Sequence, residues 1–354
     1  MKIPQRYKHT EFGLIPDDWV LCTFKDVLTT FSSGATPYRG IPEYYNGNIR
    51  WISSGELNYN VIYDTIEHIS ANAVRNTNLH ILNPSTFLMA ITGLEAEGTR
   101  GKCAFVGAPA TTNQSCLAIN GTDRMCVEYL FWFYRMWGDY LAFKYCQGTK
   151  QQSYTAEIVK KLPIYCPITI KEQNKIAEAL SDVDALITAL DKKIAKKRLI
   201  KQGAMQQLLT GKKRLCGFSD EWTIKRLGDL AKMNSGGTPD SSNSEYYGGD
   251  IPFLSISDIT STNKYISRTE KTITEKGLRN SSARIFPIKT IMYAMYASLG
   301  KCGIANISLS CSQAILGITP SKNIDTEYLY YILSYIEETV KEFGQTGTQT
   351  NLAK

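Results

Sequence analysis

The sequence of 354 residues lacks several features that assign a chain to a common class. It contains only three histidines, and its nine cysteines include no C-x-x-C pair, so the clustered soft ligands of a zinc site are missing. No apolar run approaches the ~18 residues of a membrane span, and the N-terminus has no apolar signal-peptide stretch. We therefore expect a cytoplasmic protein with reduced thiols, no metal site and no membrane partner.

Motifs of the common cofactor-dependent and hydrolytic enzymes are also missing. There is no G-x-x-x-x-G-K-[S/T] phosphate loop, no G-x-G-x-x-G, and no Pro-Pro pair of the kind that amino-methyltransferases use beside a flipped base. Glu-x-Lys, frequent in metal-dependent nucleases, does not occur, and scattered histidines disfavour a Ser-His-Asp or Cys-His site. The sequence therefore predicts a chain that is not an enzyme and holds no cofactor of its own.

Positive charge is concentrated in one segment. The net charge is +7, and the stretch from Lys192 to Arg214 contains nine Lys or Arg and no acid. The remainder of the chain holds 31 basic and 33 acidic residues, so neither flanking part is strongly basic. If these parts bind nucleic acid, they do so through local patches or with the help of a partner.

What the sequence does contain is an internal repeat displaced by about 200 residues. The same landmarks return in the same order, with only small shifts, which indicates a duplicated domain. The matched pairs include Pro16-Asp-Asp-Trp19 with Ser219-Asp-Glu-Trp222, Ser33-Gly-Ala-Thr-Pro37 with Ser235-Gly-Gly-Thr-Pro239, Tyr44-Tyr-Asn-Gly-Asn-Ile49 with Tyr246-Tyr-Gly-Gly-Asp-Ile251, and Gly101-Lys-Cys103 with Gly300-Lys-Cys302.

Each copy has the pattern of a mixed α and β domain. Short β-branched and aromatic runs at 86–92 and 290–296 predict strands, and aromatic-rich segments beginning at Glu128 and Glu327 predict helices whose rings pack in the core. We therefore predict an α+β protein with two similar mixed α/β domains separated by a long helix. The expected boundaries are 1–165, 166–213 for the helix, and 214–354.

The separating segment, Ile170 to about Leu209, contains no proline and carries a heptad pattern. Such a helix would be roughly 60 Å long at ~1.5 Å per residue, and a single apolar stripe needs another helix to cover it. The basic half of the helix is typical of a solvated face, although its charge is also consistent with contact to phosphate or to an acidic partner. The apolar positions predicted to bind a partner are Ile176, Leu180, Val183, Ile187, Leu190 and Ile194.

Four motifs together resemble one family nearly end to end. They are Pro-x-x-Trp at the start of the first half, Gly-x-Thr-Pro followed by Tyr-Tyr-x-Gly-x-Ile, the segment Lys161–Ala177 leading into the helix, and the segment Gln206–Phe218 leading out of it. On a duplicated frame, this combination resembles the specificity (S) subunits of type I restriction-modification systems.

The resemblance implies that each half is a target-recognition domain for one half of a bipartite, asymmetric sequence in double-stranded DNA. The helix then acts as a spacer and as the dock for methyltransferase subunits, which bind S-adenosylmethionine and methylate adenine. A restriction subunit, using ATP and Mg²⁺, can join. In the family a second conserved helix follows the second domain and pairs with the first; only Gln349 to Lys354 follow Gly347-Thr348 here, so we expect the apolar stripe to bind methyltransferase helices or a second copy.

Under this resemblance, polar residues on the recurrent Gly-rich loops are the candidate DNA contacts, because Gln and Asn can read adenine and Lys and Arg can read guanine. An ordinary alternative is that these loops are shared structure. Recurrent residues suit phosphate contact better, since domains that read different sequences should differ at base-reading positions. The candidates are Thr36, Arg39, Tyr44, Tyr45, Asn46, Lys102, Gln114, Gln147, Thr149, Lys150, Gln151 and Gln152 in the first half, and Thr238, Tyr246, Tyr247, Lys301, Gln313, Gln345, Thr346, Thr348, Gln349 and Asn351 in the second.

A second function, of another class, remains open from the sequence. The chain could be a protein scaffold that joins partners through the heptad helix and does not bind DNA. A cryptic hydrolase is a third reading, but no motif supports it.

Overall fold

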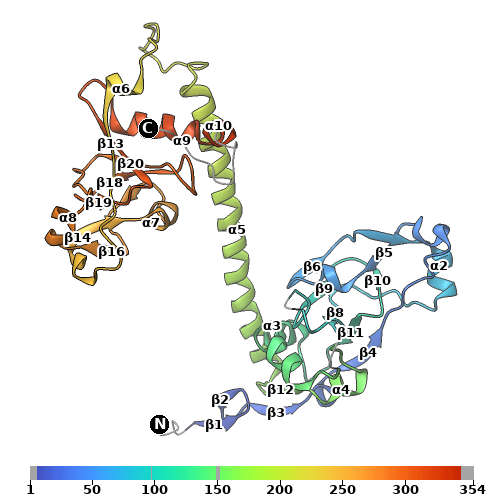
Figure 1. The fold of residues 1–354 in the computed structure, drawn as a ribbon. Helices are drawn as coiled ribbons and strands as arrows, with labels where there is room; N and C mark the ends of the chain where they lie inside the picture. The colour runs from blue at the N-terminus through green and yellow to red at the C-terminus, as the bar shows by residue number, and fades with distance from the viewer. Residues whose placement is uncertain (1–5, 97, 149–151, 344–354) are drawn as a thin grey trace. The chain divides into compact units, whose positions relative to one another are not determined.

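The computed structural model describes residues 6–96, 98–148 and 152–343 (Figure 1). It divides into two units, Met1–Asp191 and Lys192–Lys354, which we call unit 1 and unit 2. The division falls within one long helix, α5 (Ile170–Leu208). Each unit is described by itself.

Unit 1 is built on two small sheets. The larger has five strands in the order β4-β11-β8-β9-β6, and the smaller has three in the order β10-β5-β7. Their bounds are β4 (Thr29–Ser33), β5 (Ile49–Ile52), β6 (Asn60–Ile62), β7 (Glu67–Ile69), β8 (Phe87–Ala90), β9 (Cys103–Val106), β10 (Ala110–Thr112) and β11 (Cys116–Asn120).

Unit 2 repeats this arrangement strand for strand. Its five-stranded sheet has the order β13-β20-β17-β18-β15, and its three-stranded sheet has the order β19-β14-β16. The bounds are β13 (Ala231–Ser235), β14 (Tyr247–Leu254), β15 (Tyr265–Ile266), β16 (Lys271–Ile273), β17 (Ile291–Ala294), β18 (Cys302–Ala305), β19 (Ser310–Cys311) and β20 (Ile315–Pro320).

Strand directions repeat as well as strand order. The β6–β9 and β15–β18 pairs are parallel, as are β5–β10 and β14–β19, whereas β5–β7 and β14–β16 are antiparallel. Two mixed α/β domains with one topology confirm the predicted fold class and the duplication.

The short helices also correspond between the units. A capping box begins η2 (Ser54–Glu56) in unit 1 and α7 (Ile256–Ser261) in unit 2. The other short elements that correspond are α1 (Phe24–Val27), η1 (Pro42–Tyr45) and α2 (Ala71–Asn76) in unit 1, and α6 (Leu227–Leu230), η3 (Ser244–Tyr246) and α8 (Glu275–Arg279) in unit 2.

The core of each unit lies around the central strand of its larger sheet. All four residues of β8 and of β17 are buried, which explains why these strands are continuous apolar runs rather than alternating ones. The predicted aromatic helices are α3 (Val127–Tyr145) in unit 1 and α9 (Thr326–Tyr335), followed by α10 (Glu337–Phe343), in unit 2. Tyr134 of α3 and Tyr330 of α9 are buried, so rings of these helices pack in the core as predicted.

Unit 1 contains further elements at its N-terminal end. A hairpin of β1 (Tyr7–Thr10) and β2 (Gly13–Pro16) precedes β3 (Val20–Thr23), and β3 pairs antiparallel with β12 (Pro163–Cys166), which follows α4 (Ala156–Lys161). The strand β12 leads directly into α5. The sequence patterns did not predict the hairpin or the β3–β12 pair.

The helix α5 confirms the predicted segment almost to the residue. Its start is fixed to unit 1 by the buried amide of Gln173, which accepts a hydrogen bond from the Cys126 backbone and donates to the carbonyls of Arg124 and Pro167, at 2.9–3.0 Å.

Within the described ranges of the chain, no helix is long and apolar enough to cross a membrane.

Candidate nucleic-acid interface

The first Gly-x-Thr-Pro loop leaves the end of β4 and packs against the end of β10. The Ala35 backbone donates to the carbonyl of Thr112 at 3.1 Å, and a Cβ at Gly34 would overlap that carbonyl. In unit 2 the Gly237 backbone donates to the carbonyl of Cys311, and a Cβ at Gly236 would overlap the Cys311 and Ser312 carbonyls. The first glycine of each loop is therefore required by close backbone approach.

These loops bring two candidate residues together in each unit. The Thr36 hydroxyl donates to the side-chain oxygen of Gln114 at 2.5 Å, and Thr238 donates to Gln313 in the same way. All four side chains are exposed. Residues about 75 apart in the sequence thus form one exposed Thr–Gln pair per unit, and each Gln side chain also has an NH₂ group that can donate hydrogen bonds.

The tyrosines that follow the loop are partly structural. The hydroxyl of Tyr45 donates to the Pro37 carbonyl at 2.6 Å, and that of Tyr247 donates to the Pro239 carbonyl at 2.7 Å. Each ring meets an aromatic ring edge to face, Trp51 in unit 1 and Phe253 in unit 2. Burial raises the pKa of both hydroxyl groups, so both remain donors.

The neighbouring candidates lie on short 3-10 helices. Tyr44 accepts a hydrogen bond from the side chain of Asn76 at 2.8 Å, and Asn46 is exposed just after η1. Tyr246 ends η3, and its carbonyl accepts from the Thr274 backbone at 3.0 Å. These contacts engage Tyr44 and Tyr246 within their own units, whereas the Asn46 side chain is exposed.

Arg39 is engaged within unit 1. Its guanidinium makes two hydrogen bonds to Glu67, at 2.6 and 2.7 Å, and lies 4.2 Å from the ring centre of Tyr45. The hydrogen bonds from Arg39 lower the pKa of the Glu67 carboxyl. A DNA contact by Arg39 would therefore compete with a bidentate ion pair that the fold already provides.

The two recurrent lysines follow tight turns that pack against a helix. Gly101 and Gly300 both have positive φ, at 69° and 85°. Lys102 donates to Asn58 at 3.0 Å and lies over the ring of Tyr59, whereas exposed Lys301 pairs with Glu337 at 3.1 Å. Each Gly-Lys motif thus has a structural role in its own unit.

The remaining loop candidates divide into described and undescribed residues. The backbone of Gln147 exchanges two hydrogen bonds with Ser153 at 2.9 Å, and the backbone of Gln152 donates to Glu95 at 2.9 Å. Eight candidates lie outside the described residues: Thr149, Lys150, Gln151, Gln345, Thr346, Thr348, Gln349 and Asn351.

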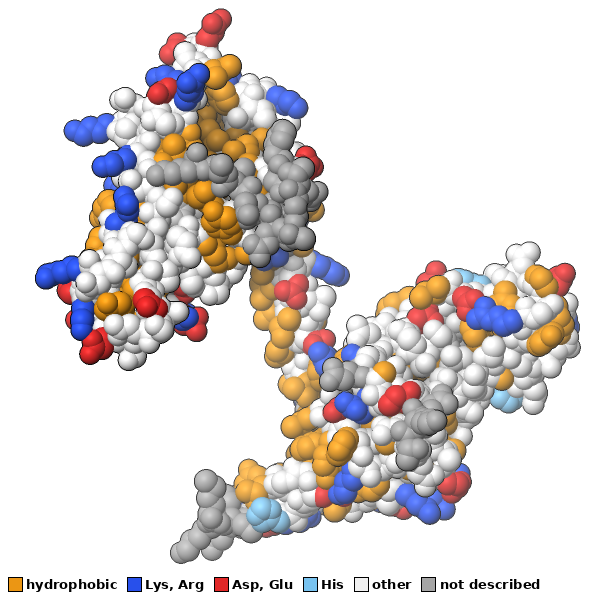
Figure 2. Space-filling view, in the orientation of Figure 1, with side chains coloured by type: hydrophobic (Ala, Val, Ile, Leu, Met, Phe, Trp, Pro, Cys, Tyr) orange, Lys and Arg blue, Asp and Glu red, His pale blue; other side chains and the backbone are white. Residues whose placement is uncertain are grey.

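The apolar stripe of α5 begins against unit 1 and then becomes exposed. Ile176 packs against the core, whereas Leu180, Val183, Ile187 and Leu190 are 43–57% exposed. Ile194, which lies in unit 2, is 48% exposed. Figure 2 shows hydrophobic side chains along this part of the helix. This is the exposure expected of a surface that another helix covers.

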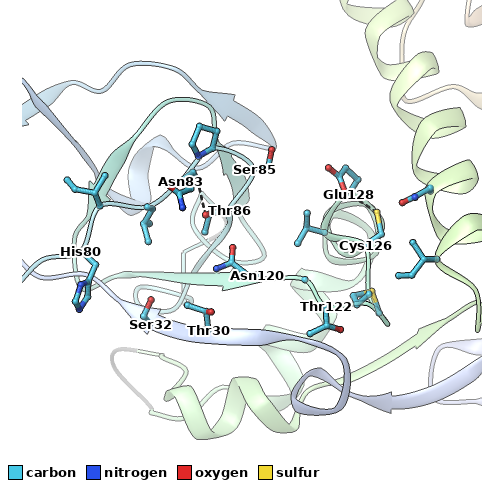
Figure 3. A pocket seen from close by; sticks show the side chains of 18 residues that line it. Thr30, Ser32, His80, Asn83, Ser85, Thr86, Asn120, Thr122, Cys126 and Glu128 are labelled. Atoms are coloured by element: carbon cyan, nitrogen blue, oxygen red, sulfur yellow. Dashed lines mark hydrogen bonds between the residues drawn. The ribbon is translucent and has the colours of Figure 1, made fainter.

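A groove of about 740 Å³ lies elsewhere in unit 1, and its lining includes Thr30 and Ser32 of β4 and Asn120 of β11 (Figure 3). The thiol of Cys126 donates to Glu128 at 3.0 Å, and burial together with that carboxylate raises its pKa to about 11. His80 lies at the opposite end of the groove (Figure 3). The groove therefore lacks the adjacent thiolate and base of a nucleophilic site. Over the residues that are described, no group of three or more metal-ligating side chains occurs.

Comparison with known proteins gives a family match over most of the chain. A family model described as the type I restriction modification DNA specificity domain matches residues 16–198 and again residues 219–354. The matches cover both repeats and the first part of α5.

Individual relatives agree with this match. The chain is 36% identical over 124 residues to the type I restriction enzyme MjaIX specificity subunit of Methanocaldococcus jannaschii, a match that covers 35% of the chain and 28% of that relative. It is 25% identical over 360 residues to the putative MjaX specificity subunit of the same organism, covering 96% of the chain and 81% of the relative.

A crystal structure of the type I restriction-modification S subunit from M. genitalium has the same fold. The TM-score is 0.62 at 15% sequence identity, and the match covers 98% of this chain and 82% of that one.

Proposed function

Because the chain belongs to the type I restriction-modification DNA specificity family, with one domain match in each half, we propose that each unit reads one half of a bipartite, asymmetric DNA sequence. The observation that carries this proposal is the same exposed Thr–Gln pair on the same loop in two units of one topology. Two copies of one scaffold suit a bipartite target, because each can present its own side chains to its own half-site.

The recurrent and the differing residues then have different tasks. Thr36 with Gln114 and Thr238 with Gln313 recur, which suits hydrogen bonds to the sugar-phosphate backbone that set the position of each unit. Sequence specificity belongs to loop positions at which the two units differ, since identical side chains would select identical bases.

The catalytic steps belong to partners. In this proposal α5 docks methyltransferase subunits, which bind S-adenosylmethionine and methylate adenine, and a restriction subunit with ATP and Mg²⁺ can join them. The open apolar stripe of α5 supports a helical partner, and a second copy of the chain is the other candidate for that surface.

A domain exchange tests the bipartite reading. Replacing residues 1–165 with the same region of a related subunit should change one half of the methylated sequence and leave the other half unchanged. The measurement is the methylome of a host that carries the complex. If the exchange altered both halves together, the units would not read DNA independently.

Two aspartate substitutions on α5 test the docking surface. Val183→Asp with Leu190→Asp should abolish assembly, because each apolar side chain contributes roughly 1.5–3 kcal/mol when buried. Both side chains are about half exposed in this chain, so the units should stay folded. The matched control is Ala185→Asp with Ala189→Asp, which adds the same charge on the opposite, exposed face of the helix. Equal assembly of both variants in a pull-down with methyltransferase would remove α5 as the dock.

The scaffold alternative rests on the same exposed stripe and omits DNA. A gel-shift assay of the chain with and without its methyltransferase separates the two functions. Sequence-specific retention of DNA supports the recognition function. A complex that assembles and shows no sequence preference would establish the scaffold instead.

A further inference from the structure

One pair of matched positions differs sharply between the two units. In unit 1, Glu67 of β7 lies opposite Trp51 of β5, and its carboxylate holds Arg39 over the Tyr45 ring. The guanidinium also lies 5.6 Å from the ring centre of Trp51. The space between the loop and the smaller sheet is thus filled by the chain's own arginine, and its charge is neutralised.

In unit 2 the matched strand position carries a lysine. Lys271 of β16 lies opposite Phe253 of β14, in the register that Glu67 has with Trp51. Ser241, which like Arg39 lies two residues after the proline of its loop, cannot reach across this space. A cleft of about 580 Å³ remains, lined by Thr238, Tyr247, Phe253 and Lys271 among others.

The electrostatics of the cleft select the kind of group that can enter it. Lys271 is exposed and, among the described residues, forms no ion pair within 4.0 Å, although Glu270 lines the same cleft. The nearby carboxylate of Asp240 is held by the backbone and hydroxyl of Ser242, at 2.9 and 2.8 Å. An arginine that entered the cleft from another molecule would be repelled by the ammonium group of Lys271. A hydrogen-bond acceptor would instead find a free ammonium donor beside the Thr238–Gln313 pair.

We propose that this cleft is a DNA-contact subsite of unit 2, in which Lys271 donates to an acceptor atom of the DNA. The acceptor is a phosphate oxygen or the O6/N7 edge of guanine, which have this chemistry in common. The inference rests on the proposed function of unit 2 and goes beyond it, because it assigns a contact to a residue outside the recurrent motifs. It also makes Arg39 a scaffold residue of unit 1.

The test uses the full chain together with its methyltransferase partner and a randomised duplex DNA library. Lys271→Ala should weaken binding about 5- to 100-fold. If Lys271 reads guanine, the selected sequences lose one preferred position in a single half-site. If it binds phosphate, the selected sequences stay the same and affinity falls uniformly, with a smaller salt dependence.

Lys322→Ala is the matched control, because it removes one exposed lysine from the turn after β20, at the opposite end of β13 from the Thr238 loop. The Lys322→Ala variant should bind DNA with the affinity of the unaltered chain and select the same sequences. Equal binding and selection by Lys271→Ala and the unaltered chain would overturn the subsite.

A second variant keeps the test independent of folding defects. Ser241→Arg with Lys271→Glu rebuilds the arginine–glutamate pair of unit 1 inside unit 2, so Tm should not fall, while the DNA contact should be lost as in Lys271→Ala. Unchanged affinity and selection in this folded variant would also overturn the subsite. If the unaltered complex itself selects no DNA sequence, the proposed function fails and the subsite fails with it. If the unaltered complex selects a sequence and the variants select the same one with equal affinity, only the subsite fails.

Discussion

Units 1 and 2 show how one scaffold accommodates different surroundings. The loop, the Thr–Gln pair and the tyrosine bonded to a proline carbonyl are the same in both. The residue opposite the aromatic side chain of the central strand of the smaller sheet is Glu67 in unit 1 and Lys271 in unit 2. Unit 1 therefore closes the space beside the loop with Arg39, whereas unit 2 leaves a cleft there. Shared backbone geometry therefore carries side chains that differ in what they can recognise.

The tryptophans of the repeat make a second contrast. Trp19 stacks on Tyr165 of β12, with ring centres 5.9 Å apart, and meets Tyr129 edge to face. Its counterpart Trp222 is 48% exposed and has Arg214 above its ring at 5.5 Å. The two matched tryptophans therefore differ in how far the chain around them covers their rings.

The largest effect should come from the buried amide that fixes α5 to unit 1. Gln173→Ala leaves three backbone groups without partners and should lower the free energy of unfolding of unit 1 by about 3 kcal/mol. Urea unfolding followed by tryptophan fluorescence reports on unit 1, because four of the five tryptophans are there. The exposed neighbour Asn174→Ala is the control and should change little. A stability equal to that of the control would show that the contacts of Gln173 do not hold the helix.

Because the Gly-x-Thr-Pro loop packs in the same way in both units, substituting its first glycine should destabilise the two units equally. Gly34→Ala and Gly236→Ala each force a Cβ onto a backbone carbonyl and should each destabilise their own unit by about 2–3 kcal/mol. Hydrogen exchange, which resolves the units separately, is the measurement. Gly55→Ala, where a Cβ meets nothing within 4 Å, should be neutral. A cost in only one unit would break the structural equivalence of the loops.

The two tryptophans should respond unequally. Trp19→Ala removes a half-buried ring with two aromatic neighbours and should cost about 2 kcal/mol, whereas Trp222→Ala should cost less than about 1 kcal/mol. Thermal unfolding of both variants gives the comparison. Equal shifts in Tm would mean that Trp222 is covered in solution.

The smallest effect on stability should be the pH dependence that the Arg39–Glu67 ion pair adds to unit 1. The pKa of Glu67 lies below its ordinary value of 4.5 in the folded chain, so the ion pair stabilises unit 1 above that pH and is lost as pH falls through the lowered value. Glu67→Gln should cost about 0.5–1 kcal/mol at pH 7, since the pair is partly exposed. Unfolding free energies measured from pH 3 to pH 7 should converge at the acid end. A constant difference at all pH values would exclude the ion pair as the cause.

Much of the architecture could be predicted from local patterns. The repeat, α5, the central strands and the aromatic helices follow from turn residues and apolar periodicity, which depend on near neighbours. The candidate loops were found because Gly-x-Thr-Pro recurs. The predicted DNA contacts and domain boundaries themselves remain predictions.

Other residues of the site gave no such local signal. Glu67 and Lys271 occupy matched strand positions, and an alignment of the repeat through β7 and β16 would have shown their opposite charges. Their importance depends on which loop side chain lies above them. Gln173 is a polar residue at the start of a charged helix, and its burial followed from neither composition nor periodicity.

The sequence by itself determined the duplication, the long helix and the family resemblance, because these depend on residues close together in the chain and on their repetition. The tertiary structure alone decided that Arg39 is bound by Glu67, that Thr36 meets Gln114, and that Lys271 has an open cleft before it. Each of these depends on strand register and loop packing between distant segments. A shift of one residue along a strand would turn the side chain to the other face of the sheet.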